Sequence, residues 1–262
     1  MDSGKHACKI ETMESTREST RLAFTVHSFD ADAFGHLHPA ALVGYLQEAA
    51  GRSAASLGWS LADLNRRGLT WVLVREHLVL DQPLHSGDTL EVETWPSGLK
   101  QLAAFRDFRI SRGNVEVGRA LATWLALDIE TRRPVRPHVI LPERLHPQTA
   151  HVLPARTPTL PEIGQPTIER RFHVRFADID PNLHVTNASY VAWALEAVDE
   201  TTWRNERLAA LDIQFLAECG LHSFVCSRSA PEGGGTRLHA IVREGDGKEL
   251  ARARTIWITR NG

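Results

Sequence analysis

The stretch 178-DIDPNLHVTNASYVAWALEAV-198 places two aspartates, an asparagine and a histidine directly before a run of apolar residues. Val191, Leu195 and Val198 recur at helical spacing in that run, which predicts an amphipathic helix. Asn187 is a good candidate for the N-cap of this helix, because its side-chain oxygen can accept a hydrogen bond from a backbone N–H that has no partner within the helix. The polar residues are therefore expected to form a loop that leads into a helix.

The same pattern occurs earlier in the chain. When 24-FTVHSFDADAFGHLHPAALVGYLQEAA-50 is set under residues 172–198, both aspartates and the histidine coincide without a gap. The later parts of the two copies align at a shorter offset, with residues 77–92 under residues 212–227. Two copies of a unit of about 100 residues indicate a duplicated domain rather than a solenoid, whose repeats are much shorter.

Each copy continues from its helix into segments that are rich in β-branched and aromatic residues. In the first copy Pro39 suits the first helical position and Gly58 suits the helix end. The segments that we predict to be strands are 71–80, 88–95, 103–111, 119–129, 209–217, 222–230, 236–244 and 250–259. A helix of about five turns on an antiparallel sheet, formed twice, is an α+β architecture.

A proline-rich segment separates the two copies, since eight prolines occur in residues 134–166. Proline lacks the N–H that helices and sheets require, so this segment is expected to be an extended connector. We therefore predict a flexible N-terminal segment over 1–20, a first unit over 21–140, a linker over 141–166 and a second unit over 167–262.

Composition excludes several classes of protein. A net charge of -2 argues against a nucleic-acid-binding surface, which usually requires a basic excess. No apolar run approaches the roughly 20 residues of a membrane span, and residues 1–20 lack the apolar region of a signal peptide. These features favour a cytoplasmic protein. The three cysteines have no CxxC spacing, so we expect no disulfide framework, no metal site and no redox cofactor.

The second unit resembles the acyl-acyl carrier protein thioesterases of plants and bacteria. The resemblance is carried by 178-DIDPNLHVTNASYVAWALE-196 and 218-ECG-220, which are similar to the family pattern D-x-N-x-H-x-N-N-x-x-Y with a later Glu-Cys-Gly. One departure is Thr186, which stands where the family often has an asparagine. The resemblance covers about residues 22–262 and implies a tandem, or double, hotdog fold. Each hotdog unit is one long helix wrapped by an antiparallel sheet.

The resemblance also implies a catalytic set, which consists of Asp180, Asn182, His184 and Glu218. Thioester hydrolysis needs a base that activates water and donors that stabilise the oxyanion. We expect Glu218 to activate the water, His184 to hydrogen-bond the thioester or the leaving sulfur, and Asn182 to position the water or the carbonyl. Asp180 would orient its neighbours. Cys219 as a nucleophile is an alternative that ranks lower, because no base for it is identifiable and a thiol needs a lowered pKa.

The first unit serves as an internal control for these assignments. Phe34 stands at the position of Asn182, and Pro83 stands at the position of Glu218. A phenylalanine cannot orient water and a proline cannot act as a base, so the first unit lacks the hydrolytic set. The aspartates and the histidine occur in both copies, so part of their role is to hold the loop that leads into the helix. We expect the role of Asp178 to be mainly structural.

The partner implied by the resemblance is an acyl carrier protein with a phosphopantetheine-linked fatty acyl chain, and the product is a free fatty acid. Carrier proteins of this kind are acidic, so a basic surface is expected, with Arg132, Arg133 and Arg136 as candidates. In the first unit Trp59 and Trp71 could line a tunnel for the acyl chain, with plain core packing as the alternative.

Other functions of the same fold stay open. The chain could hydrolyse acyl-coenzyme A, bind acyl chains without catalysis, or act as a dehydratase, although the Glu-Cys motif disfavours the last. Acyl chain length, saturation and oligomeric state cannot be read from the sequence. Hotdog units pair through their sheets, so two units in one chain could pair with each other, and a further homodimer stays open as well.

Overall fold

The computed structural model describes residues 19–143, 150–155 and 159–260. The predicted N-terminal segment 1–20 lies outside the described residues except for its last two positions, as does part of the predicted linker. The strands are β1 (Thr20–Thr25), β2 (Leu69–Leu80), β3 (Thr89–Lys100), β4 (Ala103–Arg112), β5 (Val115–Asp128), β6 (Pro134–Val135), β7 (Ile168–His173), β8 (Glu206–Phe215), β9 (Phe224–Gly233), β10 (Thr236–Arg243) and β11 (Glu249–Thr259). The helices are α1 (Pro39–Ser56), α2 (Leu61–Asn65), α3 (Pro137–Ile140), α4 (Asn187–Glu196) and α5 (Glu200–Asn205).

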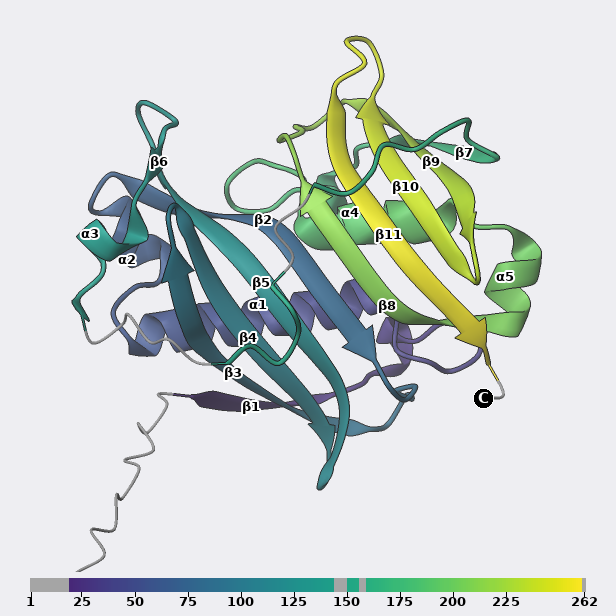
Figure 1. The fold of residues 1–262 in the computed structure, drawn as a ribbon, viewed down its shortest axis with the longest axis horizontal. Helices are drawn as coiled ribbons and strands as arrows, with labels where there is room; N and C mark the ends of the chain where they lie inside the picture. Colours follow the sequence, from purple (N-terminus) through teal and green to yellow (C-terminus); the bar gives the residue numbers. More distant parts are fainter. Residues whose placement is uncertain (1–18, 144–149, 156–158, 261–262) are drawn as a thin grey trace, which may run out of the picture.

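The described strands form one antiparallel sheet in the order β1-β3-β4-β5-β2-β8-β11-β10-β9-β7, and β6 pairs with β5. Strands β2 and β8 join the two units, and His77 lies opposite Asp212 at this junction. The repeat aligns the same two residues with each other, so this pair marks a local twofold relation between the units. Helices α1 and α4 both lie on one side of the sheet (Figure 1), which confirms the predicted α+β architecture.

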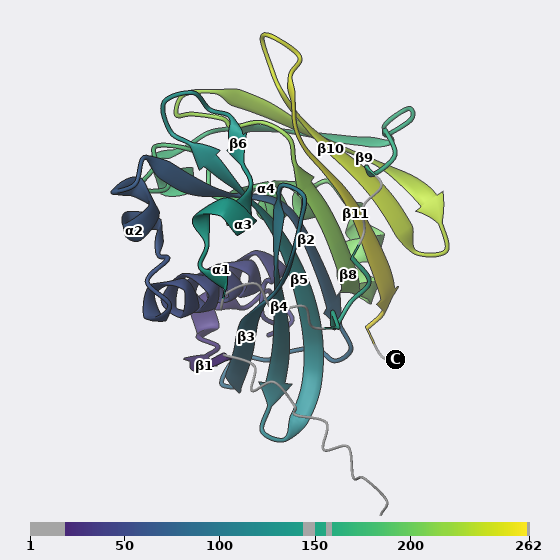
Figure 2. The same ribbon diagram turned by 60° about the vertical axis from the view of Figure 1, so that its left-hand side comes forward.

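Helix α1 is amphipathic, as its sequence predicts. Its buried side chains include Leu42, Leu46 and Ala49, and they pack in the main core between helix and sheet. Pro39 is the first helical residue, and Gly58 follows the helix end with a left-handed φ of 77°, which glycine adopts without strain. Figure 2 shows α1 lying along the inner face of the sheet of the first unit.

The second helix differs from the prediction in two respects. Helix α4 has only ten residues, which is short of five turns. It ends because Asp199 caps a new helix, α5, with its side chain. The N-cap of α4 is Thr186, whose side chain accepts from the N–H of Ser189 at 3.1 Å, and Asn187 is the first helical residue. The assignment of the N-cap to Asn187 is therefore wrong, since two good capping residues stand side by side and threonine takes the position.

The described parts of the linker cross the face of the sheet that is opposite to the helices (Figure 1). The N–H of Val152 donates to Asp107 on β4 at 2.6 Å, and the N–H of Leu160 donates to Gln214 on β8 at 2.7 Å. The linker thus contacts strands of both units. Among the helices that the structure describes, none combines the length and apolar character that a membrane span requires.

Candidate active site

The second Asp–His loop, residues 178–186, is closed by its own hydrogen bonds. The N–H of Asp180 donates to the carbonyl of His184 at 2.8 Å. In return, Oδ1 of Asp180 accepts from the N–H groups of Asn182 and His184 at 2.8 and 3.2 Å. Leu183 takes a left-handed φ of 64° at the tip of the loop. These bonds fix the path of the chain into α4.

The first Asp–His loop, residues 30–38, has the same internal bonds. The N–H of Asp32 donates to His36 at 2.7 Å, and Oδ1 of Asp32 accepts from the N–H groups of Phe34 and His36 at 2.8 and 2.9 Å. Gly35 takes the left-handed conformation here, with a φ of 76°. The first loop lacks the proposed hydrolytic set, yet Asp32 makes the same hydrogen bonds as Asp180. The aspartate therefore has a structural role in both loops.

Asp178 is buried at the start of the second loop, with 3% of its surface exposed. Burial raises its pKa, but hydrogen bonds from the backbone and guanidinium of Arg175 outweigh this effect and lower the pKa of the carboxyl. Its Oδ1 also accepts from the hydroxyl of Ser189 on α4 at 3.3 Å. These contacts fit the expected structural role of Asp178.

A short segment after β8 lies directly against the second loop. The N–H of Val185 donates to the carbonyl of Cys219 at 2.9 Å, and in the first unit the N–H of Leu37 donates to the carbonyl of Leu84 at 2.7 Å. The two acceptors are therefore equivalent in space as well as in the alignment. The residue before the acceptor is a glutamate in the second unit and a proline in the first.

Glu218 meets the second loop at its histidine. Its Oε2 lies 3.4 Å from Nε2 of His184, and about two fifths of each side chain is exposed. The amide nitrogen of Asn182 lies 3.4 Å from Oδ2 of Asp180 in the same loop. The structure thus brings the four predicted residues into one solvent-accessible cluster at the start of α4.

Two arginines that the sequence did not assign to this cluster also contact Glu218. The guanidinium of Arg132 forms an ion pair with its carboxylate, and Arg243 donates to its backbone carbonyl at 3.3 Å. Arg132 was predicted to share a surface for the carrier protein with Arg133 and Arg136, which are exposed. No sequence signal links Arg243 to the site, because it lies at the end of β10, 25 residues from Glu218.

Cys219 and Tyr190 form the buried floor beside this cluster. Cys219 is 1% exposed, in agreement with the core packing of its equivalent Leu84, and it is a free cysteine like the buried Cys226. The hydroxyl of Tyr190 is buried beside the backbone of Cys219. Burial, with Cys219 and Glu218 nearby, raises the pKa of this phenol. The Cys219 thiol is thus shielded from solvent, and its role as a nucleophile stays the alternative prediction.

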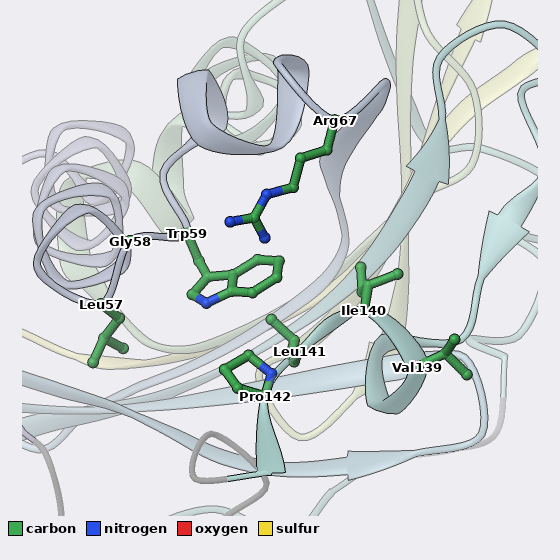
Figure 3. Close-up of a pocket in the computed structure, with 8 residues that line it drawn as sticks. All are labelled: Leu57, Gly58, Trp59, Arg67, Val139, Ile140, Leu141 and Pro142. Atoms are coloured by element: carbon green, nitrogen blue, oxygen red, sulfur yellow. The ribbon is translucent and has the colours of Figure 1, made fainter.

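The two predicted tunnel tryptophans lie together at the other end of α1, near α2 and α3. Nε1 of Trp71 is 3.4 Å from the carbonyl of Trp59, and the guanidinium of Arg67 lies 4.0 Å from the centre of the Trp59 ring. They belong to a small apolar cluster that is separate from the main core. Trp59 borders a pocket of about 550 Å³ (Figure 3). The residues that line this pocket are Leu57, Gly58, Trp59, Arg67, Val139, Ile140, Leu141 and Pro142.

Comparison with known proteins places both halves of the chain in one family. The model of the acyl-ACP thioesterase N-terminal domain matches residues 17–145, and that of the acyl-ACP thioesterase C-terminal domain matches residues 163–259. A chloroplastic acyl-[acyl-carrier-protein] hydrolase of Cuphea viscosissima is 26% identical over 259 residues, which cover 92% of this chain. The match covers 63% of the length of that relative.

Two solved structures have the same fold over nearly their whole length. An acyl-ACP thioesterase from Bacteroides thetaiotaomicron has a TM-score of 0.81 at 21% identity, covering 92% of this chain and 98% of that one. The 12:0-ACP thioesterase from Umbellularia californica has a TM-score of 0.82 at 22% identity, covering 98% of this chain and 100% of that one. These similarities confirm the predicted double hotdog fold.

Proposed function

Since the chain belongs to the acyl-ACP thioesterase family, we propose that it hydrolyses the thioester between a fatty acyl chain and acyl carrier protein, as a step of fatty acid biosynthesis. The observation that carries this proposal is the approach of the Glu218 carboxylate to the imidazole of His184 at the start of α4. The first unit offers no such pair, because Phe34 and Pro83 occupy the positions of Asn182 and Glu218.

In the proposed reaction, Glu218 takes a proton from a water molecule while the water oxygen attacks the carbonyl carbon of the thioester. Negative charge develops on the carbonyl oxygen. Backbone N–H groups in the first turn of α4 have no intrahelical acceptor and carry partial positive charge, so they suit this oxyanion. The carbon–sulfur bond then breaks, and the proton passes from Glu218 through His184 to the leaving sulfur. The products are a fatty acid and the free thiol of the carrier.

Asn182 and Asp180 prepare the loop for this step. Oδ1 of Asp180 holds the backbone of the loop, while its Oδ2 faces the amide nitrogen of Asn182. This contact sets the orientation of the amide, so that its oxygen can accept a hydrogen bond from the attacking water. Asp180 therefore acts through Asn182 and does not touch the substrate.

We further propose a division of labour between the units, with acyl-chain selection in residues 21–140, a linker over 141–166 and hydrolysis in residues 167–262. The first unit lacks the hydrolytic set and has a pocket beside Trp59, and both features support this division. A cytoplasmic location and a homodimer stay predictions from the sequence, and the plant relative is named as chloroplastic.

The test is a hydrolysis profile over acyl carrier proteins loaded with acyl chains of graded length, measured as release of thiol. The same chains on coenzyme A form the parallel series. We expect a higher kcat/KM with the carrier protein than with coenzyme A at the preferred chain length. A preference for coenzyme A would support the alternative hydrolase, and tight acyl binding without thiol release would support a non-catalytic acyl-binding protein.

A further inference from the structure

The hydrolytic cluster of the second unit contains a residue of the first unit. Arg132 follows β5, and its guanidinium pairs with Oε1 of Glu218, while Oε2 of the same carboxylate faces His184. About half of the Arg132 side chain is exposed. The carboxylate is thus held between a cation from one unit and an imidazole from the other.

The turn that carries Arg132 has a defined structure. The N–H of Arg132 donates to the carbonyl of Asp128 at 2.9 Å, and the Asp128 carboxylate accepts from the N–H and the hydroxyl of Thr131 at 2.7 and 2.8 Å. The backbone of Arg132 has a φ of 56°, in the left-handed region that residues with a side chain rarely adopt. Glycine would adopt this conformation without strain, so an arginine here suggests that its side chain is needed.

The first Asp–His loop receives an arginine in a comparable way. Arg260 follows β11 of the second unit, and its Nη1 lies 2.9 Å from Nδ1 of His36. Its guanidinium lies 3.8 Å from the centre of the Phe34 ring and donates to the carbonyl of Trp203 at 2.6 Å. Each unit therefore extends an arginine from beyond its last long strand to the other unit, at or beside its Asp–His loop. Arg260 packs on the ring of Phe34 and lies 3.8 Å from the Asp32 carboxylate, whereas Arg132 pairs with the carboxylate of Glu218, beside the second loop.

We propose that Arg132 is a positioning residue for Glu218, a role that rests on the proposed hydrolysis. By holding Oε1, the guanidinium turns Oε2 toward His184 and the attacking water. Guanidinium stays charged at all relevant pH values and offers several donors in a fixed plane, so lysine can replace its charge but not its geometry.

The test compares Arg132→Gln and Arg132→Lys with Arg109→Gln, a matched control on β4, where Arg109 forms an ion pair of similar exposure with Glu116. Each is assayed with an acyl carrier protein substrate and with an acyl-N-acetylcysteamine thioester, which has no phosphate. We expect Arg132→Gln to lower kcat by about tenfold on both substrates, a part of the roughly 10²–10⁴-fold effect of a general base, with KM nearly unchanged. Arg132→Lys should restore part of kcat, and Arg109→Gln should match the wild type.

Four results would overturn the role. An active wild type together with an unchanged kcat in Arg132→Gln would remove the role of Arg132 and leave the proposed function intact. A higher KM for the carrier substrate alone, with kcat preserved, would instead make Arg132 a contact for the phosphate of the pantetheine arm. A fall in kcat that Arg132→Lys does not relieve at all would show a merely structural contribution. A wild type that hydrolyses neither thioester would refute the proposed function and this role together.

Discussion

The buried carboxyl of Glu76 makes the stability of the fold depend on pH. It lies in the middle of β2 with 1% of its surface exposed, between Ala122 on β5 and Ile213 on β8. Its Oε2 has no hydrogen-bond partner among the described residues. Burial therefore raises the pKa of the Glu76 carboxyl from 4.5 to about 8.

The raised pKa of Glu76 has a definite consequence for stability. Between pH 4.5 and about 8, the folded chain keeps a proton that the unfolded chain has released. The free energy of unfolding must therefore fall as the pH rises through this window, and it levels off above it. An interval of about 3.5 units at about 1.4 kcal/mol per unit corresponds to a loss of up to about 5 kcal/mol from this one group.

The perturbation that tests this reasoning is Glu76→Gln, which keeps the size of the side chain and removes its ionisation. Urea unfolding of both proteins, followed by tryptophan fluorescence from about pH 5 to about pH 9, gives the free energy of unfolding at each pH. We expect the wild type to lose several kcal/mol relative to the variant across this range, and the variant to be the more stable protein at the alkaline end. Parallel curves for the two proteins would refute the reasoning.

Arg75→Met should lower the free energy of unfolding by about 3–5 kcal/mol, because it breaks a buried pair with Asp212 that joins β2 to β8 through bonds of 2.7 and 2.8 Å. Urea unfolding measures this, and a loss below about 1 kcal/mol would contradict it. Thr186→Ala should cost about 1 kcal/mol in the same assay, and Asn187→Ala distinctly less, because threonine is the N-cap of α4. Equal losses would speak against that assignment. Phe34→Asn should add no turnover in a thiol-release assay, since the first unit still lacks the glutamate, and a clear gain in rate would show that the first loop needs only the asparagine.

Much of the fold could be predicted because its signals are local. The repeat identified two units, and the segments rich in β-branched residues became the strands β2 to β5 and β8 to β11. The length of α4 could not be predicted in this way. Its apolar pattern continues to Val198, but the capping side chain of Asp199 starts a second helix on a new axis. Two adjacent capping residues likewise left the start of α4 ambiguous.

Part of the candidate site could likewise be predicted from local sequence, and part could not. Asp180, Asn182 and His184 lie within five residues, so one loop was sure to hold them together. Glu218 was predicted only from the resemblance to the family pattern, and the structure places it beside His184. The contact of Arg132 with Glu218 depends on a left-handed turn and on the pairing of β2 with β8. The residues around Glu218 carry no sequence signal for either feature. The contact of Arg132 with Glu218 could therefore be found only from the structure.

The central claim is that Glu218 is the base of a thioester hydrolase, and one comparison tests it most directly. Glu218→Gln and Cys219→Ala are assayed side by side for fatty acid release from acyl carrier protein at the preferred chain length. We predict that Glu218→Gln loses at least about 10²-fold in kcat while Cys219→Ala keeps most of the wild-type rate. An inactive Cys219→Ala together with an active Glu218→Gln would contradict the claim and move the chemistry to the thiol.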